Sequence, residues 1–327
     1  ELPRAYDLVV VTFLSKNDAR LELKGLTLAA AETSHAEGAQ PQALYDEAAK
    51  LIEDHALAIG ALAPGAVDAA RPPRGATLWE ARAAIKGLLR DLGDGHSFLS
   101  APDVVEVADR RSHADVELAT WRMYRPGIAI VHVPGFRGTD SDLLDRYANS
   151  LRDALNSSVE AGAKAWIIDL SGNRGGNMWP MLRGLEPLLG SRDIGSFRFR
   201  DGTSKPWVLE HREGITAVPD LQGAPVAVVT SGRTASSGEA VAVAFRGRPL
   251  ARSFGRPSAG YSTSNTTYTL GDGSKLYLTT AVFVDRKGHG DGRELVPDTV
   301  SGVPGSESGV RSAAGWLETC VQGACRE

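Results

Sequence analysis

The sequence predicts an α/β fold in which helices pack on a sheet. From about residue 127 onward, short runs rich in β-branched residues alternate with helical patterns. The expected strands are residues 127–133, 165–170, 225–230 and 249–254, and the helices between them are residues 140–162 and 235–245. Such alternation is typical of a sheet covered by helices. With 327 residues, 42% of them hydrophobic, the chain can bury a substantial core in one large domain or two smaller ones.

The N-terminal part of the chain predicts a helical domain over residues 1–93. It is rich in Ala, Leu and Glu, and residues 43–59 have helical spacing. A further helix is expected after the RPPRG breaker, where Thr77 and Glu80 form a capping box and Gly93 is placed to end the helix. Its apolar stripe comprises Leu78, Ala81, Ile85, Leu88, Leu89 and Leu92. The second domain then spans residues 94–327.

A hairpin is expected near the end of the second domain. The runs TTYTL and KLYLTTAVFV flank the turn GDGS at residues 271–274. Gly and Asp between two β-rich runs are a strong short-range signal for a hairpin. We find no internal repeat and no low-complexity tract.

Composition excludes several classes of protein. The formal net charge is −4 and Lys and Arg are scattered, so we expect no nucleic-acid partner. No apolar run approaches the length of a membrane span, and the first residues lack the features of a signal peptide, so any export signal is expected to have been removed. Cys320 and Cys325, the only cysteines, either form a disulfide or are two reduced surface thiols. We expect neither a metal nor a cofactor.

Residues 230–245, TSGRTASSGEAVAVAF, combine a strand end, a turn of small residues and the start of a helix. A serine at a helix N-terminus can use free backbone N–H groups to stabilise negative charge beside it. The alternative is that Thr234, Ser236 or Ser237 only caps the helix.

Residues 167–177, IIDLSGNRGGN, read as a buried strand that runs into a glycine-rich turn. Glycines there let backbone amides approach a ligand or a developing oxyanion. The spacing is not that of a dinucleotide-binding loop or a P-loop. A tight structural turn is the alternative.

His96 follows the end of the expected helix, between Gly95 and Ser97, in a loop where an imidazole can face a cleft. Most histidines are solvated or core residues. His96 is singled out by the two segments that accompany it.

These segments together resemble the C-terminal processing (tail-specific) serine peptidases and their tricorn-core relatives. LGDGHSFL resembles the L-x-D-x-H-[ST] segment, IIDLSGNRGGN the strand-to-glycine oxyanion segment, and VVTSGRTASSGEAVA the nucleophile segment V-x-G-x-[ST]-A-S-x-x-E. The hairpin and the later LVPD resemble the closing hairpin of the family. The resemblance covers roughly residues 78–300 and implies a crotonase-like (ClpP/crotonase) peptidase core with an N-terminal helical domain.

The resemblance also implies roles for individual residues. Ser236 is the implied nucleophile and His96 the general base, since the stretch that holds the lysine of a Ser-Lys dyad is here FGRPSAGYSTS, with Tyr261 near the place of the amine. The implied oxyanion donors are the amides of Gly175, Gly176 and Ser237. Asp285 and Glu294 are candidates for a third group that orients His96, and either can instead be a solvated surface charge. Glu239 matches the glutamate of the nucleophile motif.

Only residues 101–126 fill the gap in which tail-specific members carry a PDZ domain, and they are too few for that fold. We expect a short cap there, as in the compact nisin-resistance type of peptidase. This analogy implies a peptide substrate, such as a bacteriocin, a lanthipeptide or a leader peptide, and an extracytoplasmic location. The oligomeric state is left open.

Two other functions are compatible with this scaffold. One is a non-catalytic protein that binds a ligand or a peptide, because a fold alone does not establish activity. The other is a crotonase-type acyl enzyme, which predicts a coenzyme A pocket that nothing in the sequence indicates.

Overall fold

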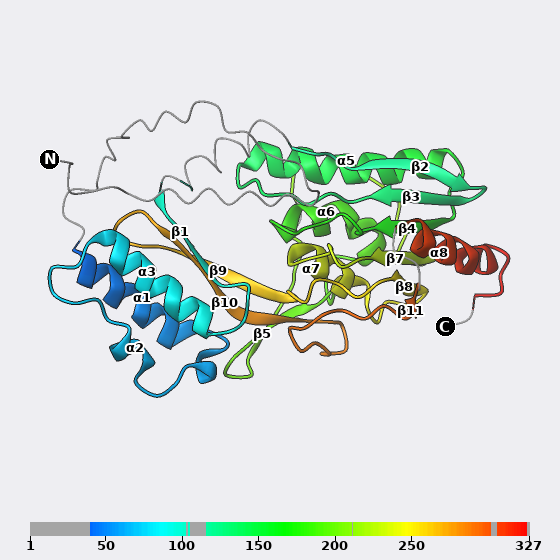
Figure 1. Ribbon diagram of the computed structural model, residues 1–327. Helices are drawn as coiled ribbons and strands as arrows, with labels where there is room; N and C mark the ends of the chain where they lie inside the picture. Colours follow the sequence, from blue (N-terminus) through cyan, green and yellow to red (C-terminus); the bar gives the residue numbers. More distant parts are fainter. Residues whose placement is uncertain (1–39, 103, 105–115, 211, 302–305, 326–327) are drawn as a thin grey trace, which may run out of the picture. The chain divides into compact units, whose positions relative to one another are not determined.

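The computed structural model describes residues 40–102, 104, 116–210, 212–301 and 306–325 (Figure 1). Twelve of the 26 residues of the expected cap, residues 101–126, lie outside this part, as do the first 39 residues of the expected helical domain. The domain boundary at residue 93 therefore stays a prediction.

The predicted mixed α/β fold is confirmed. A six-stranded sheet has the order β11-β8-β7-β4-β3-β2. All neighbours in it are parallel except β2 and β3. Its strands are β2 (Thr120–Arg125), β3 (Ile128–His132), β4 (Ala165–Asp169), β7 (Val226–Thr230), β8 (Ala251–Gly255) and β11 (Thr299–Val300).

Helices cover both faces of this sheet. On one face, α5 (Ser141–Glu160), α6 (Met178–Leu189) and α7 (Ser237–Phe245) pack against residues such as Trp166 and Ile168 of β4. On the other face, α8 (Ser306–Val321) packs against Ala165 and Ile167 of the same strand. Successive side chains of a strand point to opposite faces, so a strand buried on both sides is apolar throughout.

A second sheet has the order β1-β10-β5-β6, and β9 pairs with β10. The predicted hairpin is confirmed as β9 (Thr263–Thr269) and β10 (Lys275–Val284), closed by the hydrogen bond from the N–H of Leu270 to the carbonyl of Ser274. The other strands are β1 (Phe98–Ser100), β5 (Ser196–Phe199) and β6 (Ser204–Pro206).

The N-terminal helices pack on this second sheet. Helices α1 (Pro41–His55) and α3 (Leu78–Asp91) share a core with apolar residues of β1, β9, β10 and their turn (Figure 1). Between them lie η1 (Ile59–Ala61) and α2 (Ala66–Ala69). The predicted capping box of Thr77 and Glu80 begins α3, and Gly93 follows its end with φ 68°.

A disulfide joins Cys320, in the last turn of α8, to Cys325 just beyond the end of the helix. This settles the choice between a disulfide and two free thiols. None of the helices in the described residues is sufficiently long and apolar to cross a membrane.

Candidate active site

Ser236 lies in the turn between β7 and α7, at the N-cap position of α7. Its backbone has φ 51° and ψ −117°, whereas an ordinary N-cap residue is extended. Among the non-glycine residues that the structure describes, only Asp193 and Leu250 also have positive φ. Such a conformation costs on the order of 1–3 kcal/mol and persists only where the surroundings enforce it. Helix capping alone does not account for it.

Three hydrogen bonds fasten this turn to the segment that follows β4. The Ser231 hydroxyl donates to the carbonyl of Ser171 at 2.6 Å, and the Thr234 hydroxyl donates to the carbonyl of Leu170 at 2.8 Å. The N–H of Ala235 donates to the carbonyl of Asn173 at 3.0 Å. The strained backbone of the turn is therefore supported from the neighbouring strand.

The glycine-rich segment touches the turn at Gly175. A Cβ atom added to Gly175 would lie 2.8 Å from the carbonyl oxygen of Ala235 and 2.8 Å from the Cβ of Ser236. Gly175 also has φ 91°, which favours glycine. Two segments that are about sixty residues apart in the sequence thus meet around the Ser236 side chain.

Two backbone N–H groups beside Ser236 are free to bind an oxyanion. In the described part of the chain, the N–H groups of Gly176 and Ser237 have no acceptor, while the Ser237 hydroxyl donates to the carbonyl of Gly176. The N–H of Gly175 differs from the expectation, because it donates to Oδ1 of the buried Asn173 at 2.9 Å. The N–H of Gly175 therefore already has an acceptor, and the missing side chain of Gly175 lets its backbone approach the nucleophile turn closely.

His96 lies in the turn between α3 and β1, and its main chain is held on both sides. Its N–H donates to Oδ1 of Asp94 at 2.9 Å, and its carbonyl accepts from Nδ2 of Asn265 at 2.8 Å. The ring Nδ1 lies 2.7 Å from the hydroxyl oxygen of Thr263, and the ring packs against that of Tyr261 with centroids 5.2 Å apart. The other ring nitrogen, Nε2, has no partner among the described residues.

Burial lowers the pKa of His96, and the nearby charge of Asp94 opposes this effect only in part. The imidazole is therefore neutral over a wider pH range than an exposed histidine. A neutral imidazole can accept a proton, as a general base must.

The segment around Tyr261 joins His96 to the nucleophile turn. The Glu239 carboxylate accepts from the N–H of Ser236 at 2.7 Å and from the N–H of Tyr261 at 2.9 Å. The ring of Tyr261 in turn packs on His96. His96 and Ser236 therefore adjoin the same short segment, although no hydrogen bond joins the His96 ring to the Ser236 hydroxyl within the described residues.

Neither carboxylate expected to orient His96 contacts its ring. Asp285 instead accepts from the backbone N–H groups of Lys287 and His289, and Glu294 is exposed and makes no side-chain bond to any described residue. The partner of the imidazole is Thr263, which sequence reasoning missed because no motif marks it. Only its position at the start of the hairpin strand, close after Tyr261, was a signal.

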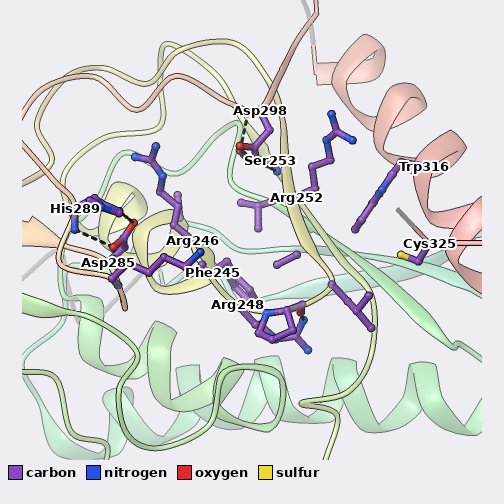
Figure 2. Close-up of a pocket in the computed structure, with 17 residues that line it drawn as sticks. Phe245, Arg246, Arg248, Arg252, Ser253, Asp285, His289, Asp298, Trp316 and Cys325 are labelled. Carbon is purple, nitrogen blue, oxygen red and sulfur yellow. Dashed lines mark hydrogen bonds and ion pairs between the residues drawn. The ribbon is translucent and has the colours of Figure 1, made fainter. Parts of the chain in front are cut away.

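The surroundings of Asp285 differ from those of the His96 ring, because the cavity that Asp285 lines is bordered by neither His96 nor Ser236. Asp285 lines a cavity of about 620 Å³ at the far end of α7, together with Phe245 and Arg246 (Figure 2). A helix of nine residues is about 13 Å long, so this cavity lies one helix length from Ser236. The buried Arg248 beside it donates to the carbonyls of five residues, namely Leu188, Pro249, Leu221, Gln222 and Ala224.

No group of three or more His, Cys, Asp or Glu side chains with metal-binding geometry occurs in the part of the chain that the structure describes.

Comparison with known proteins identifies the family of this chain. The sequence profile of Peptidase family S41 matches residues 127–301. The chain is similar to a nisin-resistance protein of Lactococcus lactis, with 39% identity over 48% of this chain and 51% of the relative. It is also similar to the carboxy-terminal processing protease CtpA of Bacillus subtilis, with 25% identity over 56% of this chain and 37% of the relative. The chain thus spans about half or less of these curated relatives.

Solved structures agree on the fold. A lipoprotein from Streptococcus agalactiae superposes with a TM-score of 0.72 at 24% identity, over 91% of this chain and 100% of that one. The photosystem II D1 C-terminal processing protease superposes with a TM-score of 0.62 at 13% identity, over 85% and 97% of the two chains. The matched profile covers both the glycine-rich segment and the nucleophile turn, and the chain belongs to peptidase family S41.

Proposed function

We propose that the chain is a serine endopeptidase in which Ser236 is the nucleophile and His96 the general base. The observation that carries this proposal is the conformation of Ser236. It is held at φ 51° beside the free N–H groups of Gly176 and Ser237. A hydroxyl next to two unused N–H donors is what acyl transfer requires, and a structural turn does not need the strained backbone that holds it there.

In the proposed mechanism, Nε2 of His96 takes the hydroxyl proton while Oγ of Ser236 attacks the carbonyl carbon of the scissile peptide bond. The carbonyl oxygen becomes an oxyanion that the N–H groups of Gly176 and Ser237 bind. His96 then gives its proton to the leaving nitrogen as the C–N bond breaks. In the second half, water attacks the acyl-enzyme while His96 takes a proton from that water, and His96 then gives this proton to Oγ of Ser236 as the ester bond breaks.

The side chains around His96 favour a Ser-His mechanism over a Ser-Lys dyad. Residues 254–264 contain no lysine, and Tyr261 packs its ring on the imidazole. Thr263 is a hydrogen-bond partner for Nδ1, which suits the tautomer whose Nε2 is a base. In the proposed mechanism, Thr263 rather than Asp285 or Glu294 orients the imidazole of His96.

The proposed substrate is a peptide, such as a bacteriocin, a lanthipeptide or a leader peptide. The similarity to a nisin-resistance protein supports this class, and the disulfide supports an oxidising, extracytoplasmic location. A crotonase-like core and an N-terminal helical domain belong to the same proposal. The non-catalytic binding protein is the second reading, and it predicts that Ser236 is unreactive.

Labelling with a fluorophosphonate probe separates the two readings. We expect the wild-type protein to be labelled at Ser236, and both Ser236→Ala and His96→Ala to lose labelling and peptide cleavage while they keep the wild-type circular dichroism. Mass spectrometry of the products from a panel of modified and unmodified peptides then gives the cleavage sites. A folded wild-type protein that resists the probe and cleaves none of the peptides would favour the binding protein.

A further inference from the structure

Glu239 is a buried carboxylate without a cationic partner. Its side chain is fully buried in α7, and all its hydrogen bonds come from neutral donors. Oε1 accepts from the hydroxyl of Ser258 and from the N–H of Gly260 at 3.0 Å. Oε2 accepts from the N–H groups of Ser236 at 2.7 Å and Tyr261 at 2.9 Å. The two oxygens thus hold four donors from two separate segments.

Such an arrangement is expensive for the fold. A carboxylate removed from water without a counter-charge is destabilised, and burial accordingly raises the pKa of Glu239. Its position in the first turn of α7 offsets part of this cost, because the positive end of the helix dipole lies there. A neutral side chain could cap the helix with a smaller desolvation free energy, so helix capping alone does not explain a carboxylate at this position.

The four donors indicate what the carboxylate does there. One is the backbone of Ser236 itself, and the others belong to the segment 258–261, which leads directly into both partners of the His96 ring. Tyr261 packs on the ring and Thr263 contacts its Nδ1. Within the described residues, this carboxylate is the one side chain that bonds both the main chain of the nucleophile and the main chain of the segment that holds the base.

We propose that Glu239 is a positioning residue of the catalytic site, whose carboxylate sets the distance and direction between Ser236 and His96. The inference rests on the proposed serine peptidase function. Glu239 touches neither substrate nor reacting atoms, and it acts through the turn on one side and through Tyr261 and Thr263 on the other.

The test is Glu239→Gln in the full chain. Glutamine has the same size, but its NH₂ group faces N–H donors, so at least one of the four bonds is lost. We expect the rate of probe labelling per folded molecule and kcat for a cleaved peptide to fall about tenfold or more, which corresponds to the loss of one charge-assisted hydrogen bond. KM should stay within about twofold of the wild-type value, since substrate contacts are untouched.

A matched control separates positioning from stability. Glu186→Gln makes the same chemical change on α6, where Glu186 accepts from Arg152 at 2.9 Å and contacts none of the candidate catalytic residues. It should lower Tm and leave the labelling rate per folded molecule unchanged. Ser258→Ala, which removes one donor to Oε1, should give a smaller loss of kcat than Glu239→Gln, and it provides the test if Glu239→Gln does not fold.

The outcomes are distinct. If Glu239→Gln, or Ser258→Ala in its place, is folded and retains the wild-type kcat and labelling rate, Glu239 is not a positioning residue. Equal losses per folded molecule in Glu239→Gln and Glu186→Gln would also overturn the inference, because they would report general destabilisation. If the wild-type protein itself is not labelled, the proposed function fails instead.

Discussion

The Nδ1 atom of His96 lies 2.7 Å from the Oγ1 atom of Thr263. Thr263 begins β9 and is buried, so its hydroxyl has a fixed place on the sheet. When the imidazole proton is on Nδ1, this hydroxyl oxygen accepts a hydrogen bond from Nδ1–H, and Nε2 is left unprotonated, as the proposed general base must be. In the proposed mechanism, a hydroxyl therefore takes the place of the carboxylate that a serine peptidase triad carries.

Replacing Thr263 should weaken the base. Thr263→Val has the same shape without the hydroxyl, and we expect kcat/KM to fall about five- to tenfold, as the loss of one neutral hydrogen bond predicts. Thr263→Ser keeps the hydroxyl and should retain most of the activity. Steady-state kinetics of the three proteins on one peptide checks this, and equal values for valine and serine would remove Thr263 from the mechanism.

The pH dependence of catalysis should reflect the burial of His96. Because burial lowers the pKa of His96, the base stays neutral to lower pH, and the acid limb of kcat/KM should have its midpoint below about 6.5, the ordinary value for histidine. A midpoint above that value would contradict the assignment.

The same pKa shift affects folding. The folded state binds fewer protons at His96 than the unfolded state, so this contribution to stability is complete above about pH 6.5. It is lost as the pH falls from there through the lower folded pKa. Urea unfolding of the wild type and of His96→Asn between about pH 5 and 8 should therefore converge at the acid end. Parallel curves would argue that His96 is not buried in solution.

Gly175 should be essential for probe labelling because its backbone lies against Ser236, and Gly162, which has a similar φ, is the control. Gly175 and Gly162 have φ of 91° and 89°, so alanine at either is strained by about 1–2 kcal/mol. A Cβ at Gly175 meets Ser236 at 2.8 Å, whereas a Cβ at Gly162 meets nothing within 4 Å. We expect Gly175→Ala to reduce probe labelling more than tenfold and Gly162→Ala to leave it intact, and similar labelling of the two would disprove the contact.

The disulfide should contribute modestly to stability. It closes a loop between Cys320 and Cys325, five residues apart, and chain entropy gives about 2 kcal/mol for so short a loop. Urea unfolding of the Cys320→Ser, Cys325→Ser double variant should show a loss of about this size. Reductant should lower the free energy of unfolding of the wild type and leave that of the double variant unchanged. A loss of unfolding free energy several times larger would mean that α8 folds only when the disulfide is formed.

Local patterns predicted much of the fold. Three features were predictable because their signal lies within a few neighbouring residues. They are the capping box before α3, the hairpin turn at 271–274 and the alternation of strands and helices. Helix α8 was missed, since it contains Gly309 and Gly315 and has a weak apolar pattern. It forms through tertiary packing, which is so close that a Cβ atom added to Gly309 would lie 3.1 Å from the Cα of Gly255.

The site was predictable only where a motif marks it. The contact between Gly175 and the nucleophile turn joins two segments that carry recognisable patterns. The partner of His96 was not predictable, because the direction of Thr263 depends on pairing with β10, whose register shifts between Thr279 and Ala281. The sequence shows that Asp285 and Glu294 are acidic, but not that neither side chain forms a hydrogen bond with the imidazole.

The conformation of Ser236 sets two selective pressures against each other. Glycine occupies positive φ without steric cost, so Ser236→Gly would relieve the strain and give a sturdier protein that is chemically inert. As long as hydrolysis is needed, selection must therefore keep serine at position 236 despite its strained backbone. In relatives that bind peptides without cleaving them, glycine is the expected substitution at this position. Its presence would identify a relative that has lost hydrolysis.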